Sequence, residues 1–265
     1  MNKTDRAMLN KVWSPFGYEY GLHPKWSPFE RYYIRIMGLV DLPSRLRARM
    51  VLREIFKQGG QHFLDLGSGT GTYSFRLSRE PSRKVCGIDI NTSRIKDSSL
   101  IAERLGRSNV IFIPGAEDSI LSKVRPDSVD TVLAVEVMQC FADPRETLTA
   151  LNKVLKPGGC LVGHVPILGY LRPSEIFLLN DQNLPELLTQ AGFEIVSITR
   201  TLGGAVRQLC RVFDKVSSHR ALVAVLFPFL LLVSCLFGAA SDDGDYRLFV
   251  ARKPPQTVRK QLSHE

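Results

Sequence analysis

The chain has 265 residues, a formal net charge of +9 and a composition typical of a folded globular protein. This length leaves room for one large α/β domain and an appended segment. Basic residues gather at Arg45–Lys57 and again at Arg207–Arg220, and no nucleic-acid-binding motif accompanies them. We therefore expect no nucleic-acid partner, and the charge suits either an anionic membrane surface or a solvated basic surface.

The five cysteines form no C-x-x-C pair and their number is odd. This pattern favours a reducing compartment and argues against a structural zinc site, so no metal is expected. Residues Met1–Lys11 are polar and charged, without the apolar core of a signal peptide. We predict a cytoplasmic protein that works at the cytoplasmic face of a membrane.

Residues 1–60 are rich in aromatic and basic side chains and are predicted to form an N-terminal helical cap. Tyr18, Tyr20, His23 and Tyr33 are candidates to line a substrate pocket from this cap. Packing is the favoured role for each of them taken singly, because aromatic side chains contribute large apolar surfaces to protein cores.

From Gln61 onward, strand-like and helix-like segments alternate, which is typical of a parallel sheet with helices on both faces. The predicted strands are His62–Leu66, Lys84–Asp89, Val110–Ile113, Thr131–Glu136, Cys160–Val165, Phe193–Thr199 and Tyr246–Arg252. The predicted helices are Thr72–Ser78, Ser93–Leu105, Arg145–Leu155 and Leu184–Ala191.

An insert over residues 204–244 separates the last two predicted strands. Its stretch Ala221–Ala240 has Ser234 as the only polar side chain and Pro228 near its middle. Twenty helical residues span about 30 Å, the thickness of a bilayer core. Both ends must return to the same sheet, however, so we expect a helical hairpin folded near Pro228 or a helix lying in the membrane interface, rather than a single crossing.

The start of the insert predicts an amphipathic helix. Basic residues recur every four positions on one face, and apolar residues form a stripe on another. The basic residues are Arg207, Arg211 and Lys215, and the apolar ones are Val206, Leu209, Phe213 and Val216. Membrane contact through residues 204–240 is the favoured interpretation, with a dimer contact or a lid over an apolar substrate pocket as alternatives.

The most informative stretch is Phe63–Thr72, an apolar strand that runs into a glycine-rich turn and then a helix. Glycine has no Cβ, so such a turn lets backbone N–H groups approach a ligand closely. The spacing is G-x-G-x-G, whereas a dinucleotide fingerprint of the G-x-G-x-x-G type needs a glycine where Thr72 stands.

Five segments in order resemble the class I S-adenosylmethionine-dependent methyltransferases, of the group that includes ubiquinone and menaquinone methyltransferases. The matching segments are Leu64–Gly71, Gly87–Ile90, Ala116–Asp118, Glu136–Met138 and Leu155–Gly159. The resemblance implies a Rossmann-like, seven-stranded sheet with an antiparallel last strand. It covers the cofactor-binding core, which we place at residues 61–203, and extends to the last strand, which with a polar tail occupies 245–265. The N-terminal cap and the apolar helical insert at 204–244 lie outside the common pattern.

The resemblance also implies which residues bind S-adenosylmethionine. The residues for the methionine part are Asp65, Gly67, Ser68, Gly69 and Gly71, and the residue for the ribose is Asp89, with Ile90 beside it as a further cofactor-binding residue. The residues for the adenine are Ala116 and Glu117, and those near the sulfonium are Val135 and Glu136. Asp65 has a second interpretation, as the charge partner of a helix N-terminus. Glu136 has an equally favoured structural interpretation.

Two positions depart from the family pattern. Gly115 stands where relatives often have an aspartate for the adenine amino group, and Cys140 stands where many have a histidine. A histidine base at position 140 therefore does not carry over. His164, near the end of the fifth strand, is the best candidate for a general base, with a hydrogen-bonded, half-buried structural histidine as the alternative.

The predicted activity is methyl transfer by direct displacement to a small, lipophilic acceptor, such as a quinone, an isoprenoid or a lipid-linked molecule. The alternative is a methyltransferase of a soluble metabolite or, less favoured, of RNA or protein. The sequence does not determine the acceptor, the methylated atom or the oligomeric state.

Overall fold

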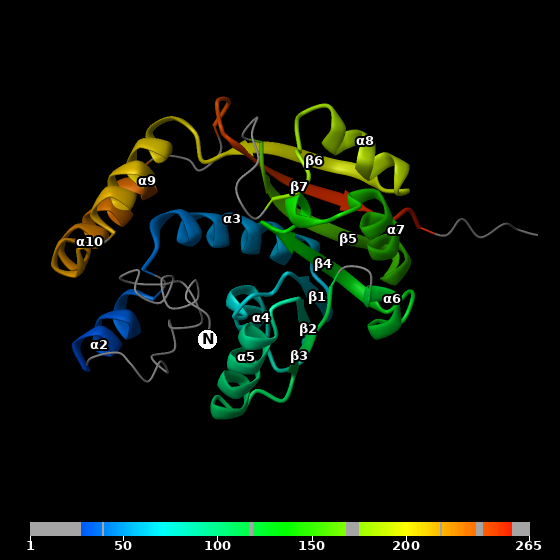
Figure 1. Cartoon of the computed structure of the whole chain (residues 1–265), viewed down its shortest axis with the longest axis horizontal. Helices are drawn as coiled ribbons and strands as arrows, with labels where there is room; N and C mark the ends of the chain where they lie inside the picture. The colour runs from blue at the N-terminus through cyan, green and yellow to red at the C-terminus, as the bar shows by residue number, and fades with distance from the viewer. Residues whose placement is uncertain are drawn as a thin grey trace, which may run out of the picture.

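A seven-stranded sheet forms the centre of the computed structural model, which describes residues 28–38, 40–116, 119–167, 175–217, 219–236 and 241–255. The strand order is β3-β2-β1-β4-β5-β7-β6 (Figure 1). The first five strands are parallel, and β7 runs antiparallel to both β5 and β6. The strands are β1 His62–Leu66, β2 Lys84–Asp89, β3 Val110–Pro114, β4 Val129–Val135, β5 Leu155–Pro166, β6 Glu194–Thr201 and β7 Tyr246–Arg252.

Helices cover both faces of the sheet, because successive strand residues point to opposite faces and both sets are apolar. On one face, α3, α4 and α5 pack on side chains such as Phe63 and Leu133. On the other, α7 and α8 pack on Leu64 and Val132. The helices are α2 Pro28–Met37, α3 Leu42–Gln58, α4 Thr72–Leu77, α5 Thr92–Arg104, α6 Ile120–Lys123, α7 Pro144–Val154, α8 Asn183–Gln190, α9 Gly204–Val216 and α10 Arg220–Leu236, with a 3-10 turn, η3, at Met138–Cys140.

The predicted fold class is confirmed, and three strands begin and end where the sequence places them: β1, β2 and β7. The N-terminal cap needs a finer description. Helix α3 buries Val51, Leu52 and Ile55 against the sheet, so it is one of the helices that cover the core. Helix α3, which the predicted cap includes, therefore packs on the same sheet as the helices of the core. Tyr18, Tyr20 and His23 lie outside the described residues.

Helices α9 and α10 lie side by side at one end of the molecule (Figure 1). The predicted hairpin near Pro228 is wrong, because α10 continues through this proline, and the reversal of direction falls between α9 and α10 instead. One face of α10 is buried, with Val223 and Phe227 packed against α3 and α9. Among the described residues, no helix is both long and apolar enough to cross a membrane.

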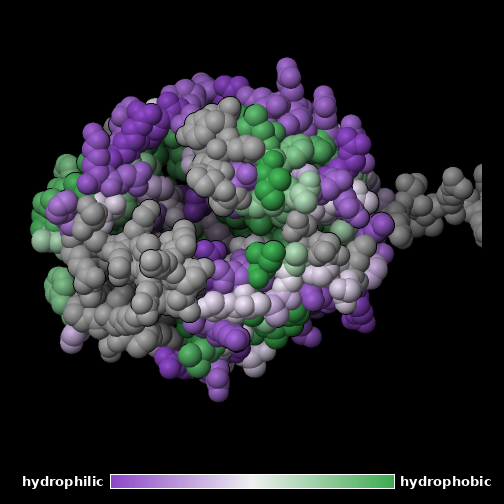
Figure 2. Space-filling view, viewed as in Figure 1, coloured by the Kyte–Doolittle hydropathy of each residue, from purple (hydrophilic) through white to green (hydrophobic). Residues whose placement is uncertain are grey.

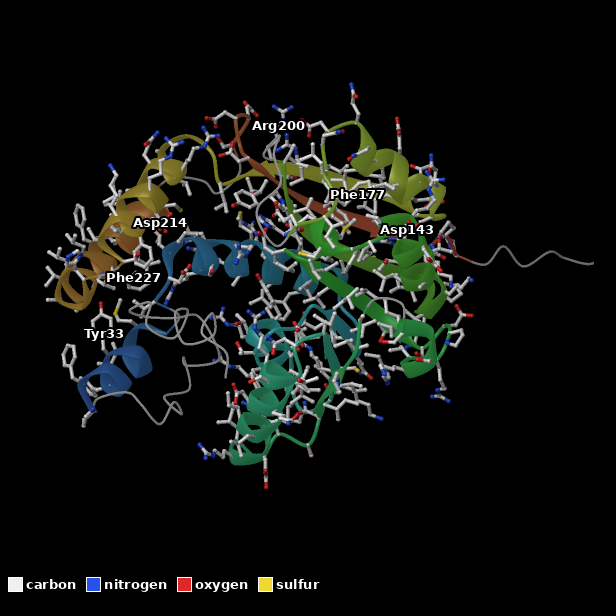
Figure 3. The ribbon with its side chains drawn as sticks, viewed as in Figure 1. Tyr33, Asp143, Phe177, Arg200, Asp214 and Phe227 are labelled. Atoms are coloured by element: carbon white, nitrogen blue, oxygen red, sulfur yellow. The ribbon has the colours of Figure 1, made fainter. Side chains whose placement is uncertain are left out.

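Tyr33 joins α2 to this helical end. Its hydroxyl donates to the Ala224 carbonyl of α10 at 2.8 Å. Figure 3 shows Tyr33 close to Phe227 of α10, where α2 meets the α9–α10 pair. The packing role expected for Tyr33 thus accounts for its position.

Candidate active site

The glycine-rich turn follows β1 at the carboxyl ends of the parallel strands, where open α/β sheets bind ligands. Gly67, Gly69 and Gly71 have φ angles of +72°, +57° and +84°, a region that favours glycine. A Cβ on Gly67 would lie 2.6 Å from Val137, and one on Gly71 would lie 2.7 Å from Phe75. A Cβ on Gly69 would meet nothing within 4 Å. The outer glycines thus allow close packing, and the middle one faces open space.

Asp89, at the end of β2, binds this turn directly. One carboxylate oxygen accepts from the Gly69 N–H and the other from the Asn91 N–H, both at 2.8 Å. Only 7% of Asp89 is exposed, whereas the next side chain, Ile90, is 74% exposed. A carboxylate beside an exposed apolar side chain suits a ribose with its attached base.

Asp65 is buried at the end of β1 and contacts the first turn of α4. It accepts hydrogen bonds from the Ser74 hydroxyl at 2.6 Å and the Ser74 N–H at 3.2 Å. Burial raises the pKa of Asp65 to about 7, although the two bonds from Ser74 oppose this rise. The described contacts are therefore those of a helix N-terminal partner.

The remaining predicted cofactor residues lie around this turn or outside the described chain. The Ser68 hydroxyl is buried and has no hydrogen-bond partner among the described residues, as expected for a group that awaits a ligand. Ala116 follows β3 and is half-buried, and Val135 ends β4 in the core. Glu117 lies outside the described residues.

Glu136 occupies a strained position directly after β4. Its φ is +55°, which side chains rarely adopt, and such strain gathers at functional sites. His164 of β5 holds it twice: the His164 carbonyl accepts from the Glu136 N–H at 2.8 Å, and Nδ1 of His164 lies 2.9 Å from Oε1 of Glu136. Glu136 keeps 17% of its side chain exposed.

The imidazole of His164 has no exposed surface, and both of its nitrogens have partners. Nε2 lies 3.1 Å from the Thr201 hydroxyl, and the ring stacks on Tyr246 with a centroid distance of 5.2 Å. Burial lowers the pKa of His164, against the influence of Glu136. The geometry is that of the structural alternative, and it does not support direct contact between His164 and an acceptor.

Two residues of this site were not predicted from the sequence. Arg47 of α3 places Nη1 3.7 Å from Oε2 of Glu136 and also hydrogen-bonds the Tyr73 side chain. Burial is the largest single influence on the pKa of Arg47 and would lower it, but the charges of Glu136, Tyr73 and Asp41 and the hydrogen bond to Tyr73 together outweigh burial and raise this pKa. Burial raises the pKa of Tyr73 to about 12. Arg47 and Tyr73 thus join α3, α4 and β4 around the glycine turn.

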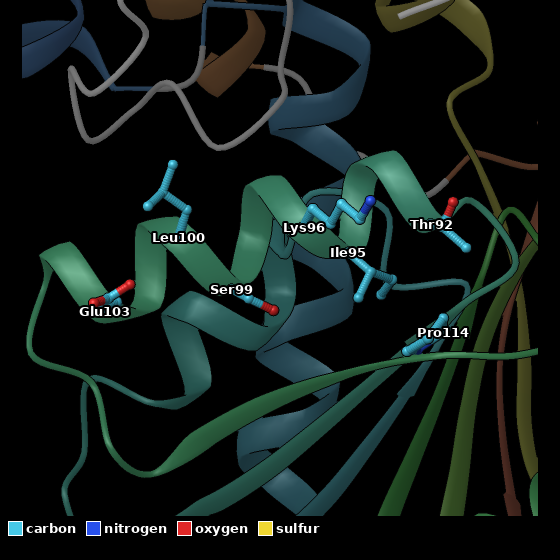
Figure 4. A pocket seen from close by; sticks show the side chains of 7 residues that line it. All are labelled: Thr92, Ile95, Lys96, Ser99, Leu100, Glu103 and Pro114. Carbon is cyan, nitrogen blue, oxygen red and sulfur yellow. The ribbon is translucent and has the colours of Figure 1, made fainter.

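A separate cavity of about 620 Å³ lies along α5 and reaches Pro114 at the end of β3 (Figure 4). Its lining includes Ile95, Lys96 and Leu100 from one side of α5. The cavity opens beside the end of β3, next to the position predicted for adenine, and its mixed polar and apolar lining suits the edge of a base.

Residues 57–190 match the family described as "Methyltransferase domain", which is about half of the chain. The chain is a class I S-adenosylmethionine-dependent methyltransferase. The predicted family, enzyme class and cofactor are confirmed. Three features fit this cofactor: the Ser68 hydroxyl, which no described residue hydrogen-bonds, the open space at Gly69, and the exposed Ile90 beside Asp89.

This methyltransferase is similar to known proteins at low sequence identity. O-methyltransferase resE of Aspergillus sclerotiorum is 26% identical over 196 residues, which cover 66% of this chain and 70% of the relative. Ubiquinone biosynthesis O-methyltransferase of Cereibacter sphaeroides is 31% identical over 156 residues, or 59% of each chain. Haemonchus contortus phosphoethanolamine N-methyltransferase 2, solved with S-adenosyl-L-methionine, has a TM-score of 0.59 at 20% identity and covers 78% of this chain and 52% of that one.

Proposed function

We propose that this methyltransferase transfers the methyl group of S-adenosylmethionine to an oxygen atom of a small, lipophilic acceptor. The observation that carries the proposal is the carboxylate of Glu136, held in a strained backbone conformation beside the glycine turn. An O–H acceptor needs a base to take its proton, and a carboxylate supplies one. The names of the two O-methyltransferase relatives also support oxygen as the methylated atom.

Each residue has a role in this proposal. The cofactor, when bound, supplies a sulfonium-activated methyl group for direct displacement. Asp89 accepts from the ribose hydroxyls, and the open space at Gly69 admits the methionine part. Glu136 accepts the proton of the acceptor hydroxyl, while His164 and Arg47 hold its carboxylate in place. Positioning of the two reactants contributes a large share of the rate.

Methyl-labelled cofactor tests this proposal. We expect label in an ether product when the purified enzyme is given a panel of phenols and isoprenoid alcohols, and no label when it is given the matching amines. Glu136→Gln should lower kcat by about 10²- to 10⁴-fold, the usual contribution of a general base, with cofactor binding retained. Glu186→Gln, an exposed change on α8, is the control. Transfer to the amines alone, or full activity in Glu136→Gln, would overturn the proposal.

We also propose that residues 204–240 contact a membrane surface where a lipophilic acceptor resides. Within the described part of this segment, four apolar side chains of α10 share one exposed face: Leu222 47%, Val225 74%, Phe229 61% and Leu232 66%. Figure 2 shows hydrophobic side chains at the edge of the molecule where α10 lies in Figure 1. Arg211 and Lys215 of α9 are exposed nearby, whereas Arg207 pairs with Asp245 at 2.8 Å.

Flotation with anionic vesicles tests the membrane contact. We expect wild-type protein to float and Val225→Asp to remain in solution, because a charge on this face opposes burial in the interface. Ile176→Asp is the matched control, since Ile176 is 63% exposed but lies outside the insert. Equal flotation of all three proteins would overturn the membrane contact. Label found only in aqueous products would favour the alternative, a soluble acceptor.

A further inference from the structure

A groove of about 1080 Å³ lies between α3, the end of α4 and α10. Six of its lining side chains are cationic, and none of those described is a carboxylate: Arg45, Arg49, Arg53, Lys57, Arg76 and Arg79. Four of the six come from α3 at intervals of four residues, so they form a row along one face of this helix. The remaining two come from α4 and the turn after it.

This row of cations lowers the stability of the folded chain when no ligand is bound, because like charges four residues apart on a helix repel each other. Nearby groups form ion pairs or hydrogen bonds with only some of these cationic side chains. Glu54 pairs with Lys57 at 2.6 Å, and Arg45 donates to the Met37 carbonyl. Arg53 and Arg79 are exposed, and neither has a carboxylate partner among the described residues. Arg53 and Arg79 therefore give the groove positive charge that no carboxylate of the described residues neutralises.

The walls of the groove are apolar. Ile36 and Phe56 are 62% and 50% exposed, and Leu231 of α10 lines the same space. The guanidinium of Arg83 lies 5.0 Å from the Phe56 ring, so this ring is already stacked on one side. A ligand that fits must bring both negative charge for the arginines and apolar surface for these walls.

We propose that the groove binds a phosphate-bearing amphiphile, with its phosphate or pyrophosphate on the arginines and its hydrocarbon part against Phe56 and Leu231. Guanidinium groups bind phosphate oxygens in pairs, which makes arginine the side chain best suited to this ligand. A concave groove with apolar walls encloses a small amphiphile, whereas a nucleic acid requires an extended basic surface.

This ligand site is separate from the methyl-transfer site. Arg47, which contacts Glu136, is two residues from both Arg45 and Arg49 and so lies about 200° away around α3. The two sites therefore use opposite faces of one helix. The inference goes beyond the proposed O-methylation and does not rest on it, because phosphate binding is measured without any methyl acceptor.

Calorimetry on the full chain with three probes tests the inference: inorganic pyrophosphate, monomeric dodecyl phosphate and dodecanol. We expect dodecyl phosphate to bind more tightly than dodecanol, and Arg53→Gln/Arg79→Gln to weaken its binding roughly 10- to 30-fold. The matched control is Arg145→Gln/Lys153→Gln, which removes the same charge from exposed positions on α7. The control should change binding less than twofold. Unchanged S-adenosylmethionine binding would show that both variants are folded.

A parallel flotation experiment with vesicles distinguishes a lipid headgroup from a free phosphorylated compound as the source of the phosphate. Flotation with phosphatidylglycerol vesicles but not phosphatidylcholine vesicles, lost in Arg53→Gln/Arg79→Gln, supports a lipid headgroup. Binding of pyrophosphate and dodecyl phosphate, with flotation either absent or unchanged in Arg53→Gln/Arg79→Gln, supports a free phosphorylated compound, because flotation that this variant keeps is due to the exposed face of α10. The inference is overturned if neither phosphate probe binds at millimolar concentration, if the α7 control loses as much affinity, or if RNA displaces the probes and binds more tightly.

Discussion

The Oε1 atom of Glu136 lies 2.9 Å from Nδ1 of His164, a histidine with no exposed surface. A carboxylate accepts only, so the proton of the neutral ring is assigned to Nδ1, and Nε2 then accepts from the Thr201 hydroxyl. The same histidine binds the Glu136 backbone through its carbonyl. His164 is thus a positioning residue for Glu136, which itself remains partly open to solvent.

This arrangement predicts a pH-dependent stability. Burial lowers the pKa of His164 below its ordinary 6.5, so below pH 6.5 the unfolded chain binds a proton that the folded chain does not. The free energy of unfolding should therefore fall as the pH decreases from 6.5, by at most about 1.4 kcal/mol per pH unit. Urea unfolding of wild type and His164→Asn at several pH values measures this contribution. Equal pH slopes in the two proteins would contradict it.

Loss of the Asp89 carboxylate should weaken cofactor binding by about 100-fold or more, because two ribose hydroxyls lose their acceptor and two backbone N–H groups lose theirs. Calorimetry of Asp89→Ala with S-adenosylmethionine measures the loss. Asp143→Ala is the control: Asp143 caps α7 by accepting from the backbone N–H groups of Arg145 and Glu146, neither of which belongs to the glycine turn. It should cost about 1 kcal/mol of stability and leave affinity unchanged. Unchanged affinity in Asp89→Ala would show that the ribose site is misplaced.

Gly69 and Gly106 form a matched pair for the glycine turn. Both have positive φ, +57° and +61°, and a Cβ on either would meet nothing within 4 Å. Alanine at each position should therefore cost a similar amount of stability, about 1 kcal/mol, from backbone strain alone. Only Gly69→Ala should also weaken S-adenosylmethionine binding, by about tenfold or more, since its methyl group enters the space we assign to the cofactor. If the two variants bind S-adenosylmethionine equally tightly, the cofactor does not occupy the space at Gly69.

The fold was largely predictable because its elements depend on local patterns. The strand His62–Leu66 and its glycine turn follow from an apolar run and the special backbone freedom of glycine. The packing of helix α10 was harder to predict, because its uniformly apolar sequence does not indicate which face is buried. Pro228 was expected to reverse the chain, yet α10 continues through it. Packing against α3 and α9 supports the helix on both sides of the proline.

The buried polar contacts of the site were not predictable in the same way, since they join residues far apart in the chain. His164 and Thr201 are 37 positions apart, and the sequence pattern alone could not pair them. The position of Arg47 in the sequence does indicate a buried role. It stands one helical turn before Val51 and two before Ile55, both fully buried, so it continues the buried row of α3. An arginine in such a row needs a partner, and Glu136 provides it.

Substitution of Arg47 should change stability far more than substitution of its exposed neighbour Arg49. Arg47→Gln removes a cation from the Glu136 and Tyr73 side chains, and we expect it to lower the free energy of unfolding by about 2–4 kcal/mol. It should also lower the methyl-transfer rate, because the Glu136 carboxylate is no longer held. Arg49→Gln, on the exposed face, should stay within about 0.5 kcal/mol of wild type. Equal stability changes, measured by urea unfolding, would contradict the buried role of Arg47.

The two interpretations of Asp65 differ in how cofactor binding responds to pH. Burial raises its pKa to about 7, so its stabilising contribution is present below the ordinary value of 3.8 and is lost as the pH rises through 7. If the ionised carboxylate also attracts the ammonium of S-adenosylmethionine, affinity should rise with pH through this range, by at most about tenfold per unit. Asp65→Asn should abolish that dependence. Ser74→Ala removes the hydrogen bond from the Ser74 hydroxyl, which lowers the pKa of Asp65, and should shift the rise in affinity to higher pH. If the affinity of the wild-type protein for S-adenosylmethionine does not change with pH, Asp65 does not bind the cofactor ammonium and serves only as the partner of the α4 N-terminus.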